Sequence, residues 1–159
     1  MKGIRVLIVV LLLGGCAAFD ASRLVPGQSS GSDVQKALGR PTEKRIAPDG
    51  EIVLWYPLRY ARVSYAARIG KDDRLIAIEQ RITQQNFDRL RPGLSRQGDV
   101  RDLLGPPGQD DFFPRQQREV WAYEAQGVQP QLFILQFSAD GVLREKYVVD
   151  DGVALDGSS

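Results

Sequence analysis

The amino-acid sequence predicts an α+β fold made of two tandem helix-helix-β-meander repeats, with the helices packed on an antiparallel sheet. Three observations lead to this prediction. The chain matches itself at a constant shift, glycine and proline end the predicted helices at equivalent places, and segments of alternating apolar and polar residues follow the helices. Helices gathered on one face of an antiparallel sheet are a common layer architecture.

The internal match appears at a shift of 66 residues, with 12 identities over positions 23 to 55. Pro26-Gly27 aligns with Pro92-Gly93, and Trp55 aligns with Trp121. Self-similarity at a fixed period marks a duplicated structural unit. We therefore expect repeats over 23–82 and 83–150 that share one interface or one sheet of about six strands, with the other face of that sheet open.

Each repeat is expected to open with two helices. The first is predicted over 20–24 and over 83–91, and Pro-Gly ends it because proline cannot continue a helix and glycine tolerates a left-handed turn. The second should begin at an N-cap serine and end at a glycine. The candidate caps are Ser29 or Ser30 with Gly39 in the first repeat, and Ser95 with Gly105 in the second.

Each repeat is then expected to close with a three-stranded antiparallel meander. Alternation over 60–69 is typical of a half-buried strand, and Asp140-Gly141 is a hairpin signal. Phe133, Leu135 and Phe137 should face the core together. Residues 151–159 are polar and rich in glycine and serine, so we expect a loose tail. The predicted strands cover 51–58, 60–69, 75–82, 119–125, 131–137 and 142–149.

The first residues have the layout of a secretory signal: two basic residues, an apolar run over 6–13, and Gly14-Gly15-Cys16. The run is too short to span a bilayer, which takes about 20 apolar residues. This reading is favoured over a buried N-terminal strand or helix. Leu13-Gly14-Gly15-Cys16 resembles the lipobox of bacterial lipoproteins, which implies removal of residues 1–15 and acylation of Cys16, with 16–22 as a lipidated tether.

That resemblance also implies a destination. The residue after the cysteine is Ala17 rather than aspartate, which in Gram-negative lipoproteins implies the outer membrane, facing the periplasm. Two or more acyl chains hold a protein stably on a membrane. Cys16 is the only cysteine, so no intramolecular disulfide can form.

Composition excludes several function classes. The chain has no histidine, which removes the usual general base and the commonest metal ligand. With Cys16 acylated, Ser-His and Cys-His nucleophilic pairs are excluded. The net charge of +1 gives no basic excess for binding nucleic acid. We therefore expect no enzymatic activity, no small-molecule substrate and no cofactor beyond the lipid on Cys16.

The second repeat resembles the BamE (SmpA/OmlA) family of outer-membrane lipoproteins. The resemblance rests on an ordered set of motifs: Arg91-Pro92-Gly93-Leu94-Ser95, Leu104-Gly105-Pro106-Pro107, Asp111-Phe112-Phe113, Trp121-Ala122-Tyr123 and Asp140-Gly141. The first repeat matches less well, through Pro26-Gly27-Gln28-Ser29, Leu38-Gly39-Arg40-Pro41 and Trp55-Tyr56, so the resemblance covers most of the mature chain. It implies a non-enzymatic accessory role beside the machinery that inserts β-barrel proteins. The tandem form also resembles the β-lactamase inhibitor protein fold. That second resemblance leaves two alternatives: a periplasmic inhibitor or sensor module, or a structural envelope lipoprotein.

Two groups of residues are candidates for a protein interface. Phe112 and Phe113, with Arg115, stand in a predicted loop, and exposed aromatics beside an arginine are enriched at interfaces. Core packing is the alternative for the two aromatics. Alternation places a second group, Tyr60, Arg62 and Arg68, on one face of a predicted strand, where a solvated face is the alternative. The paired tryptophans, Trp55 and Trp121, are expected in the core.

Overall fold

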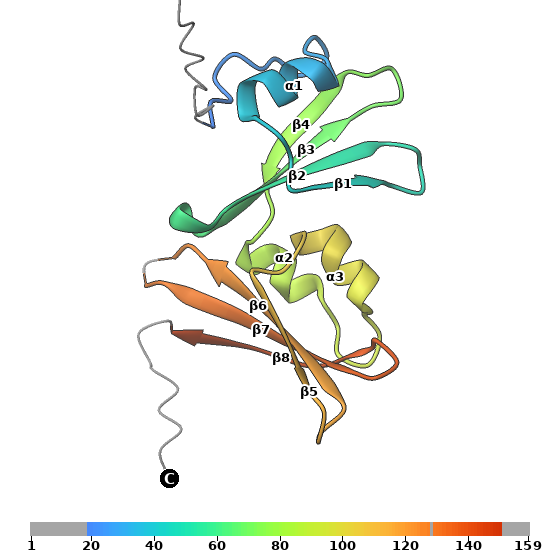
Figure 1. Ribbon diagram of the computed structural model, residues 1–159, viewed down its shortest axis with the longest axis vertical. Helices are drawn as coiled ribbons and strands as arrows, with labels where there is room; N and C mark the ends of the chain where they lie inside the picture. The colour runs from blue at the N-terminus through green and yellow to red at the C-terminus, as the bar shows by residue number, and fades with distance from the viewer. Residues whose placement is uncertain (1–18, 128, 151–159) are drawn as a thin grey trace, which may run out of the picture.

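The computed structural model describes residues 19–127 and 129–150. The predicted signal, the acylated Cys16 and the tail over 151–159 lie outside these residues. Within them, the chain forms two units, each with a four-stranded antiparallel sheet (Figure 1). No helix in this part of the chain is long and apolar enough to cross a membrane.

The first unit has one α-helix and four strands. Helix α1 (Gly31–Leu38) is followed by β1 (Glu43–Ile46), β2 (Ile52–Leu58), a short 3-10 helix (Arg59–Ala61), β3 (Val63–Ile69) and β4 (Leu75–Gln80). The strands pair in the order β1-β2-β3-β4, each antiparallel to the next. Ser30 caps α1 as predicted: its hydroxyl accepts a hydrogen bond from the backbone N–H of Asp33.

The second unit has two α-helices and four strands. Helices α2 (Gln84–Arg89) and α3 (Gln97–Leu104) precede β5 (Gln109–Phe113), β6 (Arg118–Ala125), β7 (Gln131–Ser138) and β8 (Leu143–Asp150). The sheet order is β5-β6-β7-β8. The predicted cap of α3 was wrong: Arg96 occupies the N-cap, and its backbone N–H donates to Asp99 at 2.8 Å.

The predicted fold class was wrong. Helices make up 19% and strands 44% of the structure, which consists mainly of two antiparallel four-stranded sheets and a few short helices. The first predicted helix of unit one is absent, because residues 20–24 form turns instead. The prediction of one shared sheet of about six strands was also wrong, because the strands form two separate four-stranded sheets, one in each unit.

The predicted strand content was too low because the sequence pattern does not indicate two edge strands, β1 and β5. Strands β1 and β5 lie in segments flanked by prolines and rich in charged residues, which resemble loops. All five residues of β5 are exposed, so β5 shows no apolar alternation. An edge strand needs only one hydrogen-bonded neighbour, and polar residues are favoured there because they discourage aggregation. The six predicted strands are each confirmed to within a few residues.

Each sheet buries one face against its own helices. In the first unit, Val34 and Leu38 of α1 share a core with Leu54 and Tyr56 of β2. In the second, Phe87 of α2 and the α3 side chains pack on β6, β7 and β8, where Phe133, Leu135 and Phe137 are buried as predicted. The face of the second sheet that packs against α2 and α3 also carries Trp121 and Tyr123, which are 3% and 0% exposed.

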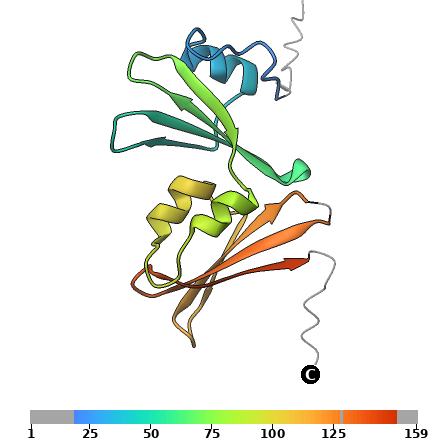
Figure 2. The same ribbon diagram turned by 180° about the vertical axis from the view of Figure 1, so that it is seen from behind.

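The units stack in four layers: α1, the β1–β4 sheet, the α2–α3 pair and the β5–β8 sheet. Figures 1 and 2 show α2 and α3 between the two sheets from opposite sides. The two helices therefore cover the inner face of their own sheet, and α3 also contacts the face of the first sheet that points away from α1. This shared helical layer joins the repeats.

Candidate functional site

The joint between the two units is built around Trp55. This side chain is 1% exposed and lies on the face of β2 opposite α1, whereas its neighbours Leu54 and Tyr56 face α1. A Cβ added to Gly105 would meet the Trp55 ring at 2.5 Å. Glycine at the end of α3 thus lets the indole ring lie against the helix backbone.

Three arginines link the two units around this contact. Arg101 of α3 donates to Glu43 at 3.1 Å, and Arg45 of β1 lies 2.9 Å from Asp102. Arg101 also lies over the Trp121 ring, 5.3 Å from its centroid. The Arg101 and Arg45 contacts attach the β1–β2 hairpin to α3. The third arginine is Arg81, which shares its partner Glu79 with Arg68 of β3.

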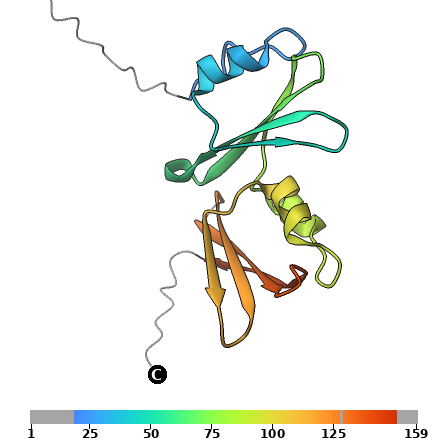
Figure 3. The same cartoon turned by 45° about the vertical axis from the view of Figure 1, so that its right-hand side comes forward.

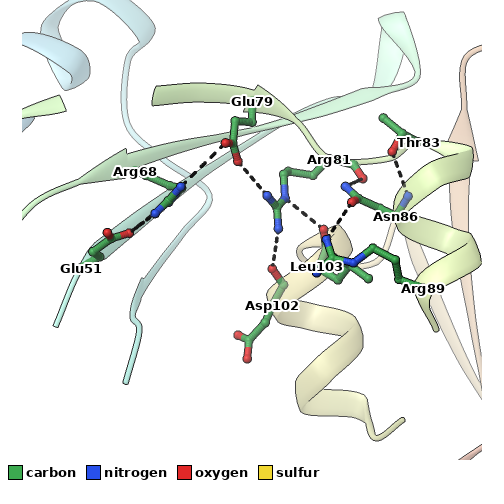
Figure 4. Close-up of polar contacts among 9 residues, drawn as sticks. All are labelled: Glu51, Arg68, Glu79, Arg81, Thr83, Asn86, Arg89, Asp102 and Leu103. Atoms are coloured by element: carbon green, nitrogen blue, oxygen red, sulfur yellow. Dashed lines mark hydrogen bonds and ion pairs between the residues drawn. The ribbon is translucent and has the colours of Figure 1, made fainter. Parts of the chain in front are cut away.

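Arg81 has the most partners in the joint (Figure 4). Its guanidinium donates to the carbonyls of Leu103 and Asp102 at 3.1 and 3.2 Å, and to Glu79 at 2.7 Å. The last carbonyls of a helix have no partner within the helix and carry partial negative charge, so a cation there is favourable. Arg81 connects the end of β4 to the end of α3.

Arg68 continues this network along β3. Its guanidinium donates to Glu51 at 2.6 Å and lies 3.8 Å from Glu79. The hydrogen bond to Glu51 raises the pKa of Arg68 above its ordinary value. The network borders a groove of about 490 Å³. Because three of the four arginines that line the groove face a carboxylate, the fourth being Arg89, its charges are nearly balanced, and we interpret it as a joint between units. Its lining includes Arg45, Val53, Trp55, Ala66, Arg68, Arg81, Arg89 and Asp102.

The predicted aromatic pair lies at the far end of the second unit. Phe112 and Phe113 end β5 and are 61% and 46% exposed, and Arg115 follows in the exposed turn to β6. The structure therefore places all three residues on one hairpin, and the core-packing alternative for the aromatics does not hold. Phe113 lies opposite Arg118 in the β5–β6 register.

The second predicted group is dispersed. Strand β3 begins at Val63, so Tyr60 lies in the preceding 3-10 helix and Arg62 caps that helix in a left-handed conformation (φ 53°). Only Arg68 is on the strand, and it belongs to the joint. The prediction that Tyr60, Arg62 and Arg68 share one strand face was wrong, because a turn interrupts the alternation. Tyr60 is 83% exposed, at one end of the sheet.

The hairpin adjoins an apolar surface that the sequence analysis did not identify. Strand register places a set of side chains on the face of the second sheet that points away from α2 and α3. We call this set the outer face. It consists of Phe113, Val120, Ala122, Leu132, Ile134, Tyr147 and Val149.

These side chains are partly exposed, with Tyr147 at 41%. Within the described ranges, the helices pack only on the opposite side of this sheet (Figure 3). A signal was present in the sequence: Leu132-Phe133-Ile134-Leu135 is apolar at every position, not only at alternate ones. Continuous apolar runs are typical of strands buried on both faces. The outer face therefore has the composition of a covered surface.

Charged residues lie at both ends of the outer face and on its β5 edge: Arg118 and Glu145 at one end, Glu124 opposite Leu132 at the other, and Asp111 opposite Val120. Arg118 donates to Glu145 at 2.8 Å and to Gln136 at 2.9 Å, and Gln136 donates to the Tyr147 hydroxyl at 3.1 Å. Over residues 19–127 and 129–150, no group of three or more Cys, Asp or Glu side chains is placed to hold a metal ion. An apolar centre with a polar edge is the usual composition of a protein interface.

Comparison with known proteins gives little further information. No protein-family model matches this chain, and neither does any curated protein. A solved structure of a DUF4309 family protein (YjgB) from Bacillus subtilis is similar over 82% of this chain and 84% of that one, with 16% sequence identity and a TM-score of 0.34.

Proposed function

We propose that this chain is a lipid-anchored, non-enzymatic accessory protein of the BamE type, held at the outer membrane with its two units in the periplasm. It binds a protein partner through the β5–β6 hairpin and the adjoining outer face. The partner belongs to the machinery that assembles β-barrel proteins. The anchor part of this proposal rests on the sequence around Cys16, and the binding part rests on the structure.

The observation that carries the binding role is the exposure of adjacent aromatics on a hairpin. Phe112 and Phe113 extend β5 away from the helices, and the next residues form the turn that contains Arg115. Aromatic and arginine side chains dominate binding energy at interfaces, while isolated exposed apolar residues are ordinary. Phe113 is continuous with the outer face, whereas Phe112, opposite Glu119, lies on the other side of β5, so the aromatics flank both sides of the hairpin.

The joint supports the same role. The salt bridges and the Trp55–Gly105 contact hold the two units in one arrangement, so the hairpin projects from a fixed scaffold at the end farthest from α1 (Figure 1). Binding residues presented by a rigid scaffold lose less conformational freedom when they bind.

Pull-down from solubilised membranes tests this function. The bait is the acylated protein, compared with Phe112→Ser/Phe113→Ser and with Leu94→Ser as a matched control, because Leu94 is also exposed (71%) but lies outside the hairpin. We expect barrel-assembly subunits in the wild-type and Leu94→Ser eluates and their loss from the double variant.

Other eluates would contradict the proposal in different ways. A soluble hydrolase captured through the hairpin would support the inhibitor alternative. Barrel-assembly subunits retained by the double variant would remove the hairpin from the interface. Their absence from every eluate would refute the BamE-like role.

A further inference from the structure

The two units can be aligned through a contact that both contain. The Tyr56 hydroxyl donates to the Gly39 carbonyl at 3.3 Å, and the Tyr123 hydroxyl donates to the Gly105 carbonyl at 2.9 Å. The two glycines are 66 residues apart, but the two tyrosines are 67 apart. The sheets are therefore offset by one residue relative to the sequence repeat, which moves a side chain to the opposite sheet face.

This offset identifies the equivalent positions on the two outer faces. Trp55 pairs with Ala66 across β2 and β3, and Ala122 pairs with Ile134 across β6 and β7. Ala122 thus occupies the place of Trp55, and Ile134 occupies the place of Ala66. The sequence partner of Trp55, Trp121, faces α2 and α3 instead.

In the first unit, a helical layer covers this surface. The α3 end lies against Trp55, and α3 side chains bond to Glu43 and Arg45 of β1. In the second unit, the equivalent surface carries Ala122, Ile134 and Tyr147, and no described residue supplies a helical layer for it (Figure 3). The repeat therefore shows which kind of structure packs on this side of the sheet.

We infer that the outer face of the second sheet binds an amphipathic helix of the partner protein, in the way that the first sheet binds α3. This inference rests on the proposed function and names the partner's structural class. In the joint, the sheet supplies a large side chain and the helix supplies glycine. At the outer face, the sheet supplies Ala122, so the partner helix inserts a large apolar side chain there, between Val120 and Ile134.

A second copy of this chain does not provide such a helix. Helices α2 and α3 bury their apolar side chains in their own unit, and their exposed positions carry no apolar side chain: Gln84, Gln85, Asp88, Arg89, Gly98, Asp99 and Asp102. The surface helix α1 exposes Ser32, Asp33, Gln35 and Lys36, and burying these polar groups on an apolar face without partners would be unfavourable.

Photo-crosslinking in the native membrane tests the inference. Benzoylphenylalanine replaces Ile134 or Tyr147 in the full-length protein, and Lys36 is the matched control on the exposed face of α1. Linked residues on the partner are located by mass spectrometry. We expect both outer-face positions to link to one partner, at residues three or four apart in its sequence, because that spacing marks one face of a helix. The Lys36 position should give no such links.

In the variant Ala122→Trp, the indole ring would occupy the space on the outer face that the partner's apolar side chain enters, and the ring points away from the core. We expect it to lower both crosslinks about tenfold or more, equivalent to about 1.4 kcal/mol of binding, with an unchanged urea midpoint. Partner residues spaced two apart would indicate a strand and overturn the inference. Links to a second copy or to residues 151–159, equal links from Lys36, or no links would also overturn it.

The two proposals fail separately. Capture of barrel-assembly subunits through Phe112 and Phe113 without helical links from Ile134 would leave the proposed function intact and refute the docked helix. Helical links to a protein outside that machinery would do the reverse.

Discussion

Gly105→Ala tests whether the two units are joined as the structure shows. Gly105 has φ of 88° and ψ of −165°, a region used essentially only by glycine, where a side chain costs about 1–3 kcal/mol. The added Cβ would also lie 2.5 Å from the Trp55 ring, and overpacking of this kind costs about 1–3 kcal/mol. The free energy of unfolding should therefore fall by about 2–6 kcal/mol in total.

Gly93→Ala separates the two contributions. Gly93 has φ of +82°, but nothing lies within 4 Å of its added Cβ, so only the backbone cost of about 1–2 kcal/mol applies. The assay is urea unfolding of the Cys16→Ser protein, followed by tryptophan fluorescence, with the slope m checked for constancy. Trp55 and Trp121 are both buried and provide the signal.

The difference between the two variants is the decisive quantity. We expect Gly105→Ala to be less stable than Gly93→Ala by about 1–3 kcal/mol. Equal losses would mean that Trp55 does not pack against the end of α3 in solution, and the stacking of the two units would have to be abandoned.

Three further predictions concern the joint and the tyrosines. Arg81→Ala should lower the free energy of unfolding by about 2–3 kcal/mol. Arg81→Lys should recover less than half of that loss, because an ammonium group cannot donate in the geometry of the guanidinium group. Full recovery by Arg81→Lys in urea unfolding would contradict this role of the guanidinium group. Tyr123→Phe should destabilise the protein by about 1–2 kcal/mol because the Gly105 carbonyl loses its buried donor, and a neutral effect would count against that bond. Burial raises the pKa of Tyr56 from 10.0 to about 12. The folded state therefore holds the phenolic proton more tightly than the unfolded state does. The contribution of Tyr56 to the free energy of unfolding should be complete below pH 10 and lost as the pH rises from 10 to 12. Urea midpoints of wild type and Tyr56→Phe over that range check this, and parallel curves would refute it.

The sequence correctly predicts the helices and strands whose own residues carry a strong pattern. Strands such as β7 carry β-branched and aromatic residues that pack on a sheet, and α1 has a serine cap and a glycine end. The exposed hairpin aromatics, Phe112 and Phe113, were also identified, because two adjacent aromatics cannot both enter a core from one strand.

Other features depend on contacts distant in sequence. The polar edge strands β1 and β5 are defined by their neighbours, not by their own residues. Arg81 acts through carbonyls 21 and 22 residues away. The one-residue offset that places Trp55 and Trp121 on opposite sheet faces cannot be read from an alignment that matches them. For the same reason, the outer face was not foreseen.

The intact mass of the membrane-extracted protein, measured with a Cys16→Ser control and with crosslinking in the same sample, tests whether the protein is a lipid-anchored partner of the barrel-assembly machinery. A lipid-anchored accessory protein predicts a mass that lacks residues 1–15 and carries acyl chains, with crosslinks to barrel-assembly subunits. The Cys16→Ser control should carry no acyl chains. Acylation without those crosslinks would retain the anchor and contradict the BamE-like role, and an unacylated Cys16 in the wild-type protein would contradict the membrane-anchored account altogether.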